Sequence, residues 1–314
     1  MQPVTVVALG GNAILRRGQS GTASQQRRNL QETSRQLVRL IQRGYRLVIT
    51  HGNGPQVGAI LLQHEEGQRA GIPPMPLDVC VAESQGLLGY LIQQSLYNEL
   101  VRANIEKSVV TILTQTAVRP DDPAFAHPTK PIGPFYTEQQ ARELAARTGL
   151  PFVDDAGRGY RRVVASPRPL AIVEAETIRQ LVQQGVVVIA TGGGGIPVVR
   201  RPDYELEGVE AVIDKDLASA RLAIQLHADL FLILTDVPRV YLGYRTPGQR
   251  EVQRMTVAEA RAFLARGEFA EGSMGPKVQA CVEFVERTGK RAVITALEMA
   301  ESAADGQTGT TIVP

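Results

Sequence analysis

The lysines of this chain are few, and three of them stand where an ammonium group would be chemically useful. Arginine fills 29 of the 34 basic positions, and the five lysines are Lys107, Lys130, Lys215, Lys277 and Lys290. Lys107 and Lys290 precede strand-like runs in polar turns and are interpreted as surface residues. The other three lie beside proline, glycine or aspartate. An ammonium group suits a single phosphate oxygen, whereas a guanidinium group imposes a two-pronged geometry. We therefore predict that Lys130, Lys215 and Lys277 are functional.

Two of these lysines stand near predicted helix starts. In Asp214-Lys215-Asp216 the first aspartate can cap a helix, which places Lys215 beside the free amides of the helix terminus. Asp216 is well placed to orient ammonium groups, and Lys277 ends a glycine turn that runs into another helix. Lysines and amides that converge on a triphosphate would supply the electrostatic stabilisation that phosphoryl transfer requires. The alternative is that the Asp-Lys-Asp triplet is only a solvated helix cap.

Three apolar, strand-like runs each end in a glycine-rich turn. Glycine lets the backbone adopt positive φ and lets a ligand approach the amides closely. At the carboxyl ends of parallel strands, such turns bind anions together with helix N-termini. One such turn is often only a tight connection, but three together predict a crevice for phosphate groups. The turns are Gly10-Gly11-Asn12, His51-Gly52-Asn53-Gly54 and Gly192-Gly193-Gly194-Gly195.

Two familiar nucleotide-binding motifs do not occur in the sequence. The pattern G-x-x-x-x-G-K-[ST] is missing, because Gly289-Lys290 lacks the earlier glycine and precedes a strand. The dinucleotide fingerprint also fails, since Gly10-Gly11-Asn12-Ala13 lacks its spacing and the second strand ends in His51-Gly52. This excludes an NAD-dependent oxidoreductase. Phosphates must then be held by amides from several turns and by lysines from distant segments.

No general base is evident among the histidines. Of His51, His64, His127 and His227, only His51 adjoins a glycine turn, where packing under the loop is favoured over orienting it. An acceptor that is already an anion needs no deprotonation before it attacks. The pattern therefore favours an acid acceptor, which would yield an acyl phosphate, over an alcohol.

Composition limits the partners and the location that we expect. The net charge of +2 creates no field that would recruit nucleic acid or an anionic membrane. No apolar run approaches the roughly 20 residues that span a bilayer, and the first residues do not resemble a secretory leader. The two cysteines, Cys80 and Cys281, fit neither a disulfide framework nor a zinc spacing. We expect a cytoplasmic protein that binds neither nucleic acid nor membrane.

Strand-like and helix-like segments alternate along the chain. The strand candidates are short apolar runs, as is typical of parallel strands covered on both faces. The alternation predicts an α/β fold, a three-layer αβα sandwich with a mainly parallel open sheet, in one domain over 1–314. Thr256 and Glu259 form a capping box, and Pro276 suits a first helical position. The predicted strands are 4–9, 46–50, 108–113, 186–190, 230–235, 291–295 and 310–313, and the predicted helices are 25–43, 81–102, 177–184, 217–227, 257–266 and 276–288.

A proline-rich stretch interrupts this alternation. It contains Lys130, a short helix with Thr137 and Gln140 as its capping box, and a hairpin. The hairpin should pair 152–154 with 160–164 across Ala156-Gly157-Arg158-Gly159. Because the stretch has apolar residues of its own, we predict that 118–166 is a small projecting subdomain that closes over a substrate. A decorative excursion is the alternative.

Several motifs together resemble the carbamate kinases, a group within the amino-acid kinase superfamily. The glycine turns alone indicate the superfamily, and three strings are more specific. The resemblance extends from the first strand to Gly309-Thr310. The motifs are VVALGGNA at 6–13, HGNGPQVG at 51–58, PTKPIGP at 128–134, TGGGGIP at 191–197, VIDKD at 212–216 and GSMGPK at 272–277.

The resemblance implies an amino-acid kinase fold, a homodimer, and Mg²⁺-dependent interconversion of ATP and carbamate with ADP and carbamoyl phosphate. Members commonly run toward ATP, as the last step of arginine fermentation. Mg²⁺ would be held mainly by nucleotide phosphates rather than by protein ligands. The implied catalytic residues are Lys130, Lys215, Asp216 and Lys277. The implied substrate and phosphate contacts are Gly10, Gly11, Asn12, Gly52, Asn53, Gly54, Gly193 and Gly194. The nucleotide contacts are Thr235, Asp236, Val237, Tyr241, Met274 and Gly275.

Two other functions compete with this interpretation. The chain could phosphorylate another small acid such as N-acetylglutamate, although PTKPIGP in the inserted stretch argues against it. It could also be a nucleotide-sensing regulator that has lost catalysis, although all three lysines and Asp216 are present. The sequence departs from the family pattern at Ala165, where proline is expected, and at Pro238, beside the predicted nucleotide edge.

Overall fold

An eight-stranded sheet forms the centre of the molecule. The computed structural model describes residues 2–16, 18–155, 157, 159–270 and 272–314. The strand order is β15-β17-β16-β12-β1-β2-β9-β3. The strands are β1 (Val4–Leu9), β2 (Arg46–His51), β3 (Val109–Thr111), β9 (Val187–Ile189), β12 (Leu230–Thr235), β15 (Arg254–Thr256), β16 (Ala292–Ala296) and β17 (Thr310–Val313).

The sheet is mainly parallel, as predicted. All neighbouring strands run parallel except β16 and β17, which are antiparallel. The predicted strands outside the hairpin all fall on strands of this sheet, and among its members only the edge strand β15 was not predicted. The carboxyl ends of β1, β2 and β12 therefore lie side by side, which brings their following turns to one edge.

Helices cover both faces of the sheet. Successive side chains of a strand point to opposite faces, so Val6 packs in one layer and Val7 in the other. The first layer holds α5, α6, α7 and α8, and the second holds α1, α3 and α9. This is the predicted three-layer arrangement. The helices are α1 (Ala23–Gln42), α3 (Leu77–Arg102), α5 (Ala175–Gln183), α6 (Lys215–Gln225), α7 (Val257–Ala265), α8 (Met274–Thr288) and α9 (Ala300–Ala304).

The predicted helices are confirmed to within four residues at their ends, with two corrections. The sequence analysis missed α2 (Gly54–Arg69), because three glycines and weak amphipathicity hide its periodicity. Pro276 is the third residue of α8 rather than the first. Proline still fits there, since the first-turn N–H groups have no partner within the helix. The capping boxes of Thr137 and Thr256 are confirmed. None of the helices in the described ranges is both long and apolar enough to cross a bilayer.

Two smaller sheets flank the centre and were not predicted. A four-stranded sheet has the order β11-β10-β4-β8, and its strand β10 follows directly on the Gly192–Gly195 turn. A two-stranded sheet pairs β13 with β14 beyond the end of β12. The strands are β4 (Gln115–Val118), β8 (Ala171–Ile172), β10 (Ile196–Arg200), β11 (Leu206–Gly208), β13 (Val240–Leu242) and β14 (Arg250–Val252).

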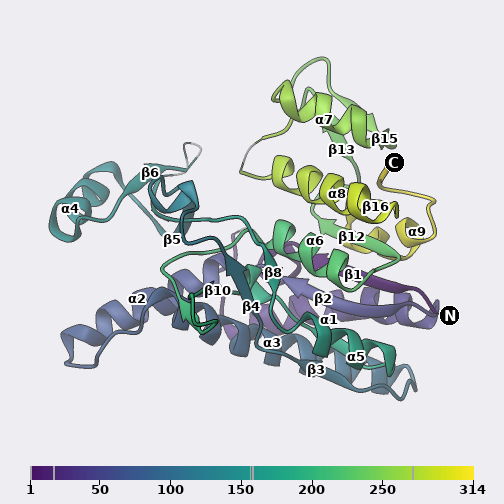
Figure 1. Cartoon of the computed structure of the whole chain (residues 1–314), viewed down its shortest axis with the longest axis horizontal. Coiled ribbons are helices and arrows are strands. Elements are labelled where there is room, and N and C mark those ends of the chain that lie inside the picture. The colour runs from purple at the N-terminus through teal and green to yellow at the C-terminus, as the bar shows by residue number, and fades with distance from the viewer. Residues whose placement is uncertain (1, 17, 156, 158, 271) are drawn as a thin grey trace.

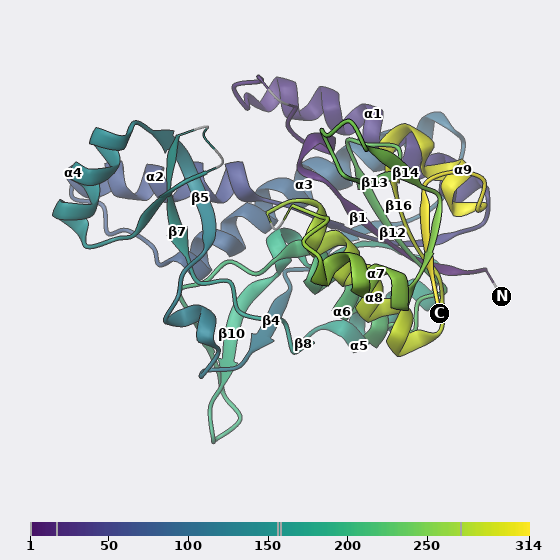
Figure 2. The same ribbon diagram turned by 90° about the horizontal axis from the view of Figure 1, so that it is seen from above.

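A three-stranded sheet with one helix projects from one end of the molecule, far from both termini (Figures 1 and 2). We call residues 130–164 the projecting unit: β5 (Lys130–Tyr136), α4 (Glu138–Thr148), β6 (Phe152–Asp154) and β7 (Tyr160–Val164). The predicted hairpin is confirmed, since β6 and β7 are antiparallel, although Ala156 and Arg158 of its turn lie outside the described residues. Val118 belongs to β4 and pairs with β10, so the unit begins later than the predicted boundary of 118. Its role as a lid stays a prediction.

The projecting unit rests on α2 through a backbone contact. A Cβ atom at Gly58 of α2 would lie 2.3 Å from the Cα of Gly133 in β5. The atoms that this Cβ would meet are backbone atoms that cannot move aside, so the helix and the strand touch only because residue 58 is glycine. Gly133 is suited to its place by its φ of +76°, and a Cβ there would meet nothing within 4 Å. The position of the projecting unit therefore depends on this pair.

We predict that Gly58→Ala forces α2 and β5 apart and lowers the free energy of unfolding by about 1–3 kcal/mol, the usual cost of overpacking. Gly67→Ala in the same helix is the control, because a Cβ there meets Ile72 no closer than 3.7 Å. That change should leave stability equal or raise it by about 0.5–1 kcal/mol. Urea titrations of both variants measure the difference, and equal effects would contradict the account.

Candidate active site

The side chain of Asp214 caps the start of α6. The Oδ1 of Asp214 accepts hydrogen bonds from the amides of Asp216 and Leu217, at 2.9 and 3.3 Å. This is the predicted N-cap, so Lys215 is the first residue of the helix. The amides and the dipole of a helix N-terminus favour an anion near this lysine.

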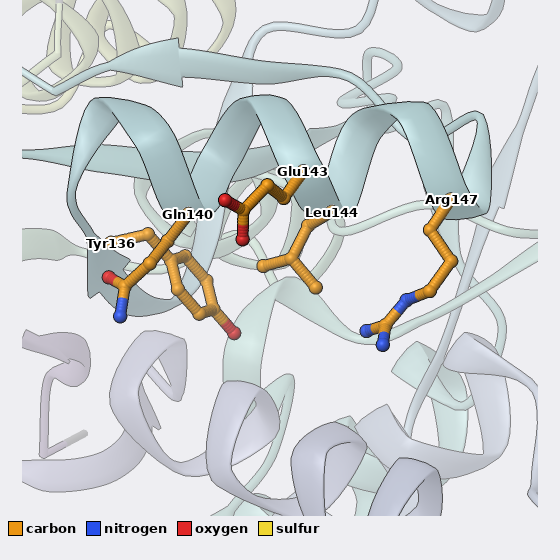
Figure 3. Close-up of a pocket in the computed structure, with 5 residues that line it drawn as sticks. All are labelled: Tyr136, Gln140, Glu143, Leu144 and Arg147. Atoms are coloured by element: carbon orange, nitrogen blue, oxygen red, sulfur yellow. The ribbon is translucent and has the colours of Figure 1, made fainter.

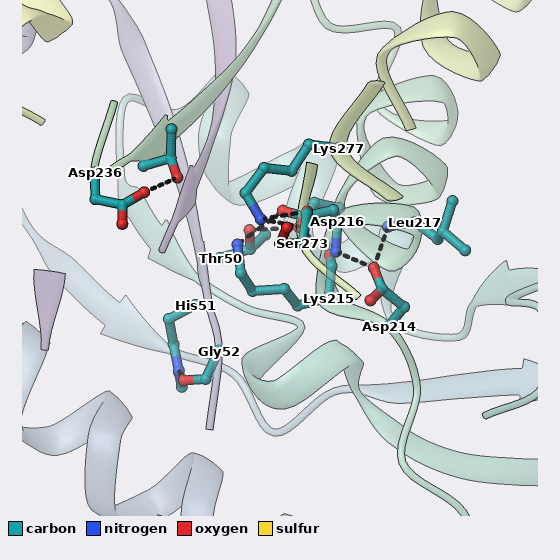
Figure 4. Close-up of polar contacts among 12 residues, drawn as sticks. Thr50, His51, Gly52, Asp214, Lys215, Asp216, Leu217, Asp236, Ser273 and Lys277 are labelled. Carbon is teal, nitrogen blue, oxygen red and sulfur yellow. Dashed lines mark hydrogen bonds and ion pairs between the residues drawn. The ribbon is translucent and has the colours of Figure 1, made fainter. Parts of the chain in front are cut away.

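Asp216 joins two lysines that are far apart in the sequence. Its Oδ1 lies 2.7 Å from Lys215 Nζ, and its Oδ2 lies 3.0 Å from Lys277 Nζ (Figure 4). Lys277 comes from the first turn of α8, which packs beside α6, and it also donates to Ser273 O at 3.3 Å. The Asp216 side chain is 4% exposed, and those of Lys215 and Lys277 are 14% and 15% exposed. A buried carboxylate thus holds the ammonium groups of two mostly buried lysine side chains.

Burial and charge act on these three groups in opposite directions. Burial alone raises the pKa of Asp216, but Lys215 and Lys277 outweigh it, so the pKa lies well below its ordinary value. Burial lowers the pKa of Lys215, and Asp216 does not fully restore it. Burial also lowers the pKa of Lys277, but the attraction of Asp216, Asp214 and Asp236 outweighs it, and the pKa rises. The two lysines are therefore unequal, and Lys215 gives up its proton more readily.

The turns after β1 and β2 lie against this group. Gly10 N donates to Leu234 O at 2.8 Å, and a Cβ at Gly10 would clash with that same oxygen, so glycine is needed for β1 and β12 to approach. Gly11 and Asn12 are exposed, and nothing lies within 4 Å of a Cβ at Gly11. A Cβ at Gly52 would lie 3.2 Å from Lys215 Cδ, so the second turn borders the lysine stem. The first turn is therefore open at Gly11, and the second turn lies against Lys215.

In the Gly192–Gly195 turn, glycine is required by close packing. Gly193 and Gly194 are buried and have φ of +64° and +93°. A Cβ at Gly193 would lie 2.1 Å from Asn53 Nδ2, and one at Gly194 would lie 2.5 Å from Ile213 O. The turn packs under the loop of Asn53 and under the segment that leads to α6. Packing alone thus requires these glycines, and their predicted contact with phosphate stays a prediction.

Two buried polar residues of α3 hold these turns, and the sequence analysis missed them. Asn53 Nδ2 donates to Ser84 Oγ at 2.8 Å. The amide nitrogen of Gln85 donates to Thr114 O and to Gly192 O, both at 3.0 Å, and its oxygen accepts from Thr114 N at 2.8 Å. The signal was present as two adjacent polar residues between the apolar positions Val81 and Leu88, which lie on the buried side of α3.

A pair of hydroxyls fastens the backbone of Lys215 to the end of β2. Ser219 Oγ donates to Lys215 O at 2.5 Å, and Thr50 Oγ1 lies 2.6 Å from Ser219 Oγ. Because the single proton of Ser219 is used, Thr50 must be the donor in the second bond. Neither Thr50 nor Ser219 was predicted, because in the sequence each looks like an ordinary polar residue.

His51 packs beneath the glycine turns. It is buried, and burial lowers its pKa to about 4, so the ring is neutral at neutral pH. Its Nδ1 lies 3.0 Å from Gly52 O, which can only accept, so Nδ1 carries the proton. The ring is buried, as the favoured packing role requires, but its hydrogen bond to Gly52 also orients the loop, the alternative that was not favoured.

Lys130 reaches the site from the projecting unit. Its Nζ lies 2.8 Å from Asp214 Oδ2, the oxygen that does not cap α6. The two side chains are 32% and 17% exposed. Asp214 therefore links the projecting unit to the helix that carries Lys215, a contact that the sequence analysis did not foresee.

The predicted nucleotide residues lie at the ends of β12 and at the start of α8. Thr235 Oγ1 donates to the exposed Asp236 at 3.1 Å, and Val237 follows. Tyr241 packs on Tyr244 with 6.0 Å between ring centroids. Met274 and Gly275 begin α8, and Gly275 N donates to Ala270 O at 3.0 Å. Their contact with a nucleotide stays a prediction.

A pocket elsewhere on the projecting unit is separate from these residues. It has a volume of 340 Å³ and is lined by side chains of β5 and α4 (Figure 3). None of its lining residues belongs to the predicted site. They are Tyr136, Gln140, Glu143, Leu144 and Arg147.

The carboxylates around the lysines are poorly suited to hold Mg²⁺ by themselves. Both oxygens of Asp216 accept from lysines, and both oxygens of Asp214 are used by the helix cap and Lys130. Asp236 is exposed and makes its described contact with Thr235. That nucleotide phosphates supply most of the ligands of the ion stays a prediction.

A sequence profile of the amino acid kinase family matches residues 3–296. The chain belongs to this family, and it is a phosphotransferase. Solved structures agree, since the carbamate kinase from Giardia lamblia bound to AMP-PNP superposes with a TM-score of 0.92 at 46% identity, over 99% of this chain and 98% of that one.

Relatives of known name narrow the class further. The carbamate kinase of Pyrococcus furiosus is 53% identical over 310 residues, which are 98% of each chain. Carbamate kinase 1 of Enterococcus faecium is 51% identical over 294 residues, which are 93% of each chain. Within the amino acid kinases, the chain is therefore a member of the carbamate kinase group, as the motifs indicated.

We predict that Asp216→Asn destabilises the protein most at neutral pH. The two ammonium groups then face each other without a counter-charge, and we expect the free energy of unfolding to fall by about 3 kcal/mol. Because the folded pKa of Asp216 lies below its ordinary value of 3.8, its stabilisation is complete above that pH and is lost as the pH falls through the folded pKa.

Urea titrations over a pH series measure the difference in the free energy of unfolding between the wild type and the Asp216→Asn variant. This difference should narrow only under strongly acidic conditions. Asp121→Asn is the control, because Asp121 is also ion-paired but lies on the surface with 67% of its side chain exposed. It should change stability little. A difference in the free energy of unfolding that grows as the pH falls would contradict the account.

Proposed function

We propose that this enzyme transfers the γ-phosphoryl group of ATP reversibly to carbamate, giving ADP and carbamoyl phosphate. The observation that carries the proposal is the carboxylate of Asp216 with Lys215 on one oxygen and Lys277 on the other. The likeness to carbamate kinases over nearly the whole chain supports the choice of acceptor.

The two lysines would stabilise the transferring group. In the transition state, negative charge spreads over the equatorial phosphoryl oxygens while the bond to ADP breaks and the bond to the carbamate oxygen forms. Two ammonium groups already held by Asp216 meet that charge without having to reorganise. The dipole of α6, whose first residue is Lys215, would add a positive potential on the same side.

The reaction needs no protein base. Carbamate is an anion, so its oxygen attacks phosphorus without losing a proton. His51, the one histidine of the turns, is neutral and donates through Nδ1 to its own loop. Its role is to shape the turn rather than to move a proton.

Lys130 would exchange partners during turnover. In the structure it pairs with Asp214, and a third of its side chain is exposed. A bound phosphate would offer the ammonium group a second anion within the same site. Closure of the projecting unit would then bring Lys130 to the substrate and exclude water.

Further parts of the proposal rest on the resemblance to carbamate kinases. We propose that the enzyme runs toward ATP in arginine fermentation, uses Mg²⁺ bound with the nucleotide, and acts in the cytoplasm.

We also propose a homodimer. Its contact would lie on α3, where four large apolar side chains are 42–55% exposed. They are Leu87, Tyr90, Tyr97 and Val101.

The substrate assignment predicts a selective assay. With ADP and Mg²⁺, ATP should form from carbamoyl phosphate and not from acetyl phosphate at the same concentration. A coupled assay for ATP measures both rates. Equal rates with the two donors, or no ATP from either, would overturn the substrate assignment.

The geometry of the two lysines predicts that charge alone is insufficient. Lys215→Arg and Lys277→Arg should each lower kcat by about 10²–10³, nearly as much as the alanine variants, because a planar fork cannot take the place of the ammonium beside Asp216. ADP affinity should change much less, because the glycine amides still hold the diphosphate.

The chain provides matched controls for these variants. Lys107 donates to Gly185 O, and Lys290 lies 3.6 Å from Asp229, both away from the turns of the site. Arginine at either position should leave kcat unchanged. Steady-state rates and ADP titrations of all four variants decide the matter, and a fully active Lys277→Arg enzyme would refute the geometric argument.

A further inference from the structure

Helices α2 and α3 bring three potential metal ligands together away from the lysines. His64 lies on α2, and Cys80 and Glu83 lie one turn apart on α3. One ligand atom from each side chain lies within 4.8 Å of the other two. Within the ranges that the structure describes, this is the one group of three such side chains at that spacing.

The spacing is close to that of a tetrahedral site. Metal–ligand bonds of about 2.0–2.3 Å to nitrogen, oxygen and sulfur place neighbouring ligand atoms roughly 3.3–3.6 Å apart. His64 Nε2 and Glu83 Oε1 are now hydrogen-bonded at 2.8 Å, so an ion would have to separate them by a fraction of an ångström. Their side chains are 21% and 42% exposed, which leaves them free to make that shift.

The surroundings of Cys80 favour a cation. The carboxylates of Glu83, Glu210 and Asp78 lie near the buried thiol of Cys80 and act on it electrostatically. These three carboxylates create a negative potential at the sulfur. Its described hydrogen bond is a long contact of 3.7 Å to Met75 O, so the sulfur has no strong partner that a metal would have to displace.

We propose that His64, Cys80 and Glu83 bind a divalent transition-metal ion of the zinc class. A thiolate with an imidazole and a carboxylate suits Zn²⁺ or Co²⁺, whereas Mg²⁺ and Ca²⁺ prefer oxygen ligands throughout. Three protein ligands leave a fourth position for water. The site is independent of the phosphoryl-transfer centre.

Such an ion would fasten α2 to α3 at the base of the projecting unit. Cys80 packs in the same apolar cluster as Ile132 and Val164 of that unit. Asn53, directly before α2, is hydrogen-bonded to Ser84 of α3, and this bond holds the second glycine turn. The ion would thus stiffen the support of both the turn and the projecting unit.

Cobalt provides a direct test, because a thiolate bound to Co²⁺ gives a sulfur-to-metal charge-transfer absorption. We expect chelator-treated protein without nucleotide to develop this band with one equivalent of Co²⁺ and to lose it when Zn²⁺ is added. Cys80→Ser should abolish the band. Cys281→Ser should retain it, because Cys281 is the other buried free cysteine and lies on α8.

Two further variants keep the test valid if Cys80→Ser fails to fold. Glu83→Gln and His64→Gln change partly exposed side chains, and each should weaken Co²⁺ binding by at least about 10-fold. Zn²⁺ should also raise the melting temperature of the wild type but not of His64→Gln. The proposal is overturned if no charge-transfer band appears, or if the affinity for Co²⁺ is the same in both variants as in the wild type.

Discussion

A single buried carboxylate holding two ammonium groups is the interaction on which the site depends. Two lysines placed side by side would repel each other and, if mostly buried, would lose their protons. Asp216 removes this obstacle, since each of its oxygens accepts from one lysine. Lys215, Lys277 and Asp216 together carry a net positive charge, and they lie beside the turns at the end of the sheet. In the proposed reaction, the transferring phosphoryl group would complete the neutralisation that one aspartate leaves unfinished.

The fold brings this group together from segments that are remote in the sequence. Lys215 and Asp216 begin α6, Lys277 lies in the first turn of α8, and these helices pack on the same face of the sheet. The turns after β1 and β2 reach the same edge because β1 pairs with β2 and β12 in parallel. Buried polar residues of α3 and Ser219 of α6 then fix the backbone of the turns and of Lys215. The geometry of the turns and of Lys215 therefore depends on buried residues that lie behind them.

The sequence predicted the central sheet, most helices and the candidate lysines, because these have local signatures. Continuous apolar runs mark β1 and β12, and the Asp-Lys-Asp triplet after a loop marks the cap of α6. Helix α2 escaped prediction because three of its residues are glycine, and one of them, Gly58, serves the close contact with Gly133 rather than helix formation. The supports were also hidden, since the partner of Gln85 lies more than a hundred residues away at Gly192. The spacing of the cysteines gave no sign of a metal site, because the ligands near Cys80 come from two helices. Pairings of this kind appear only when the chain is folded.

A double-mutant cycle on kcat tests most directly whether Asp216 acts by holding the lysines. Asp216→Asn and Lys277→Met are made singly and together, and the phosphoryl-transfer rate is measured for each. If the carboxylate and the ammonium act as one unit, the double variant should be about as slow as the slower single variant, since the second change removes nothing that still functions. Effects on kcat that multiply in the double variant would show that Asp216 and Lys277 act independently, and would contradict the account.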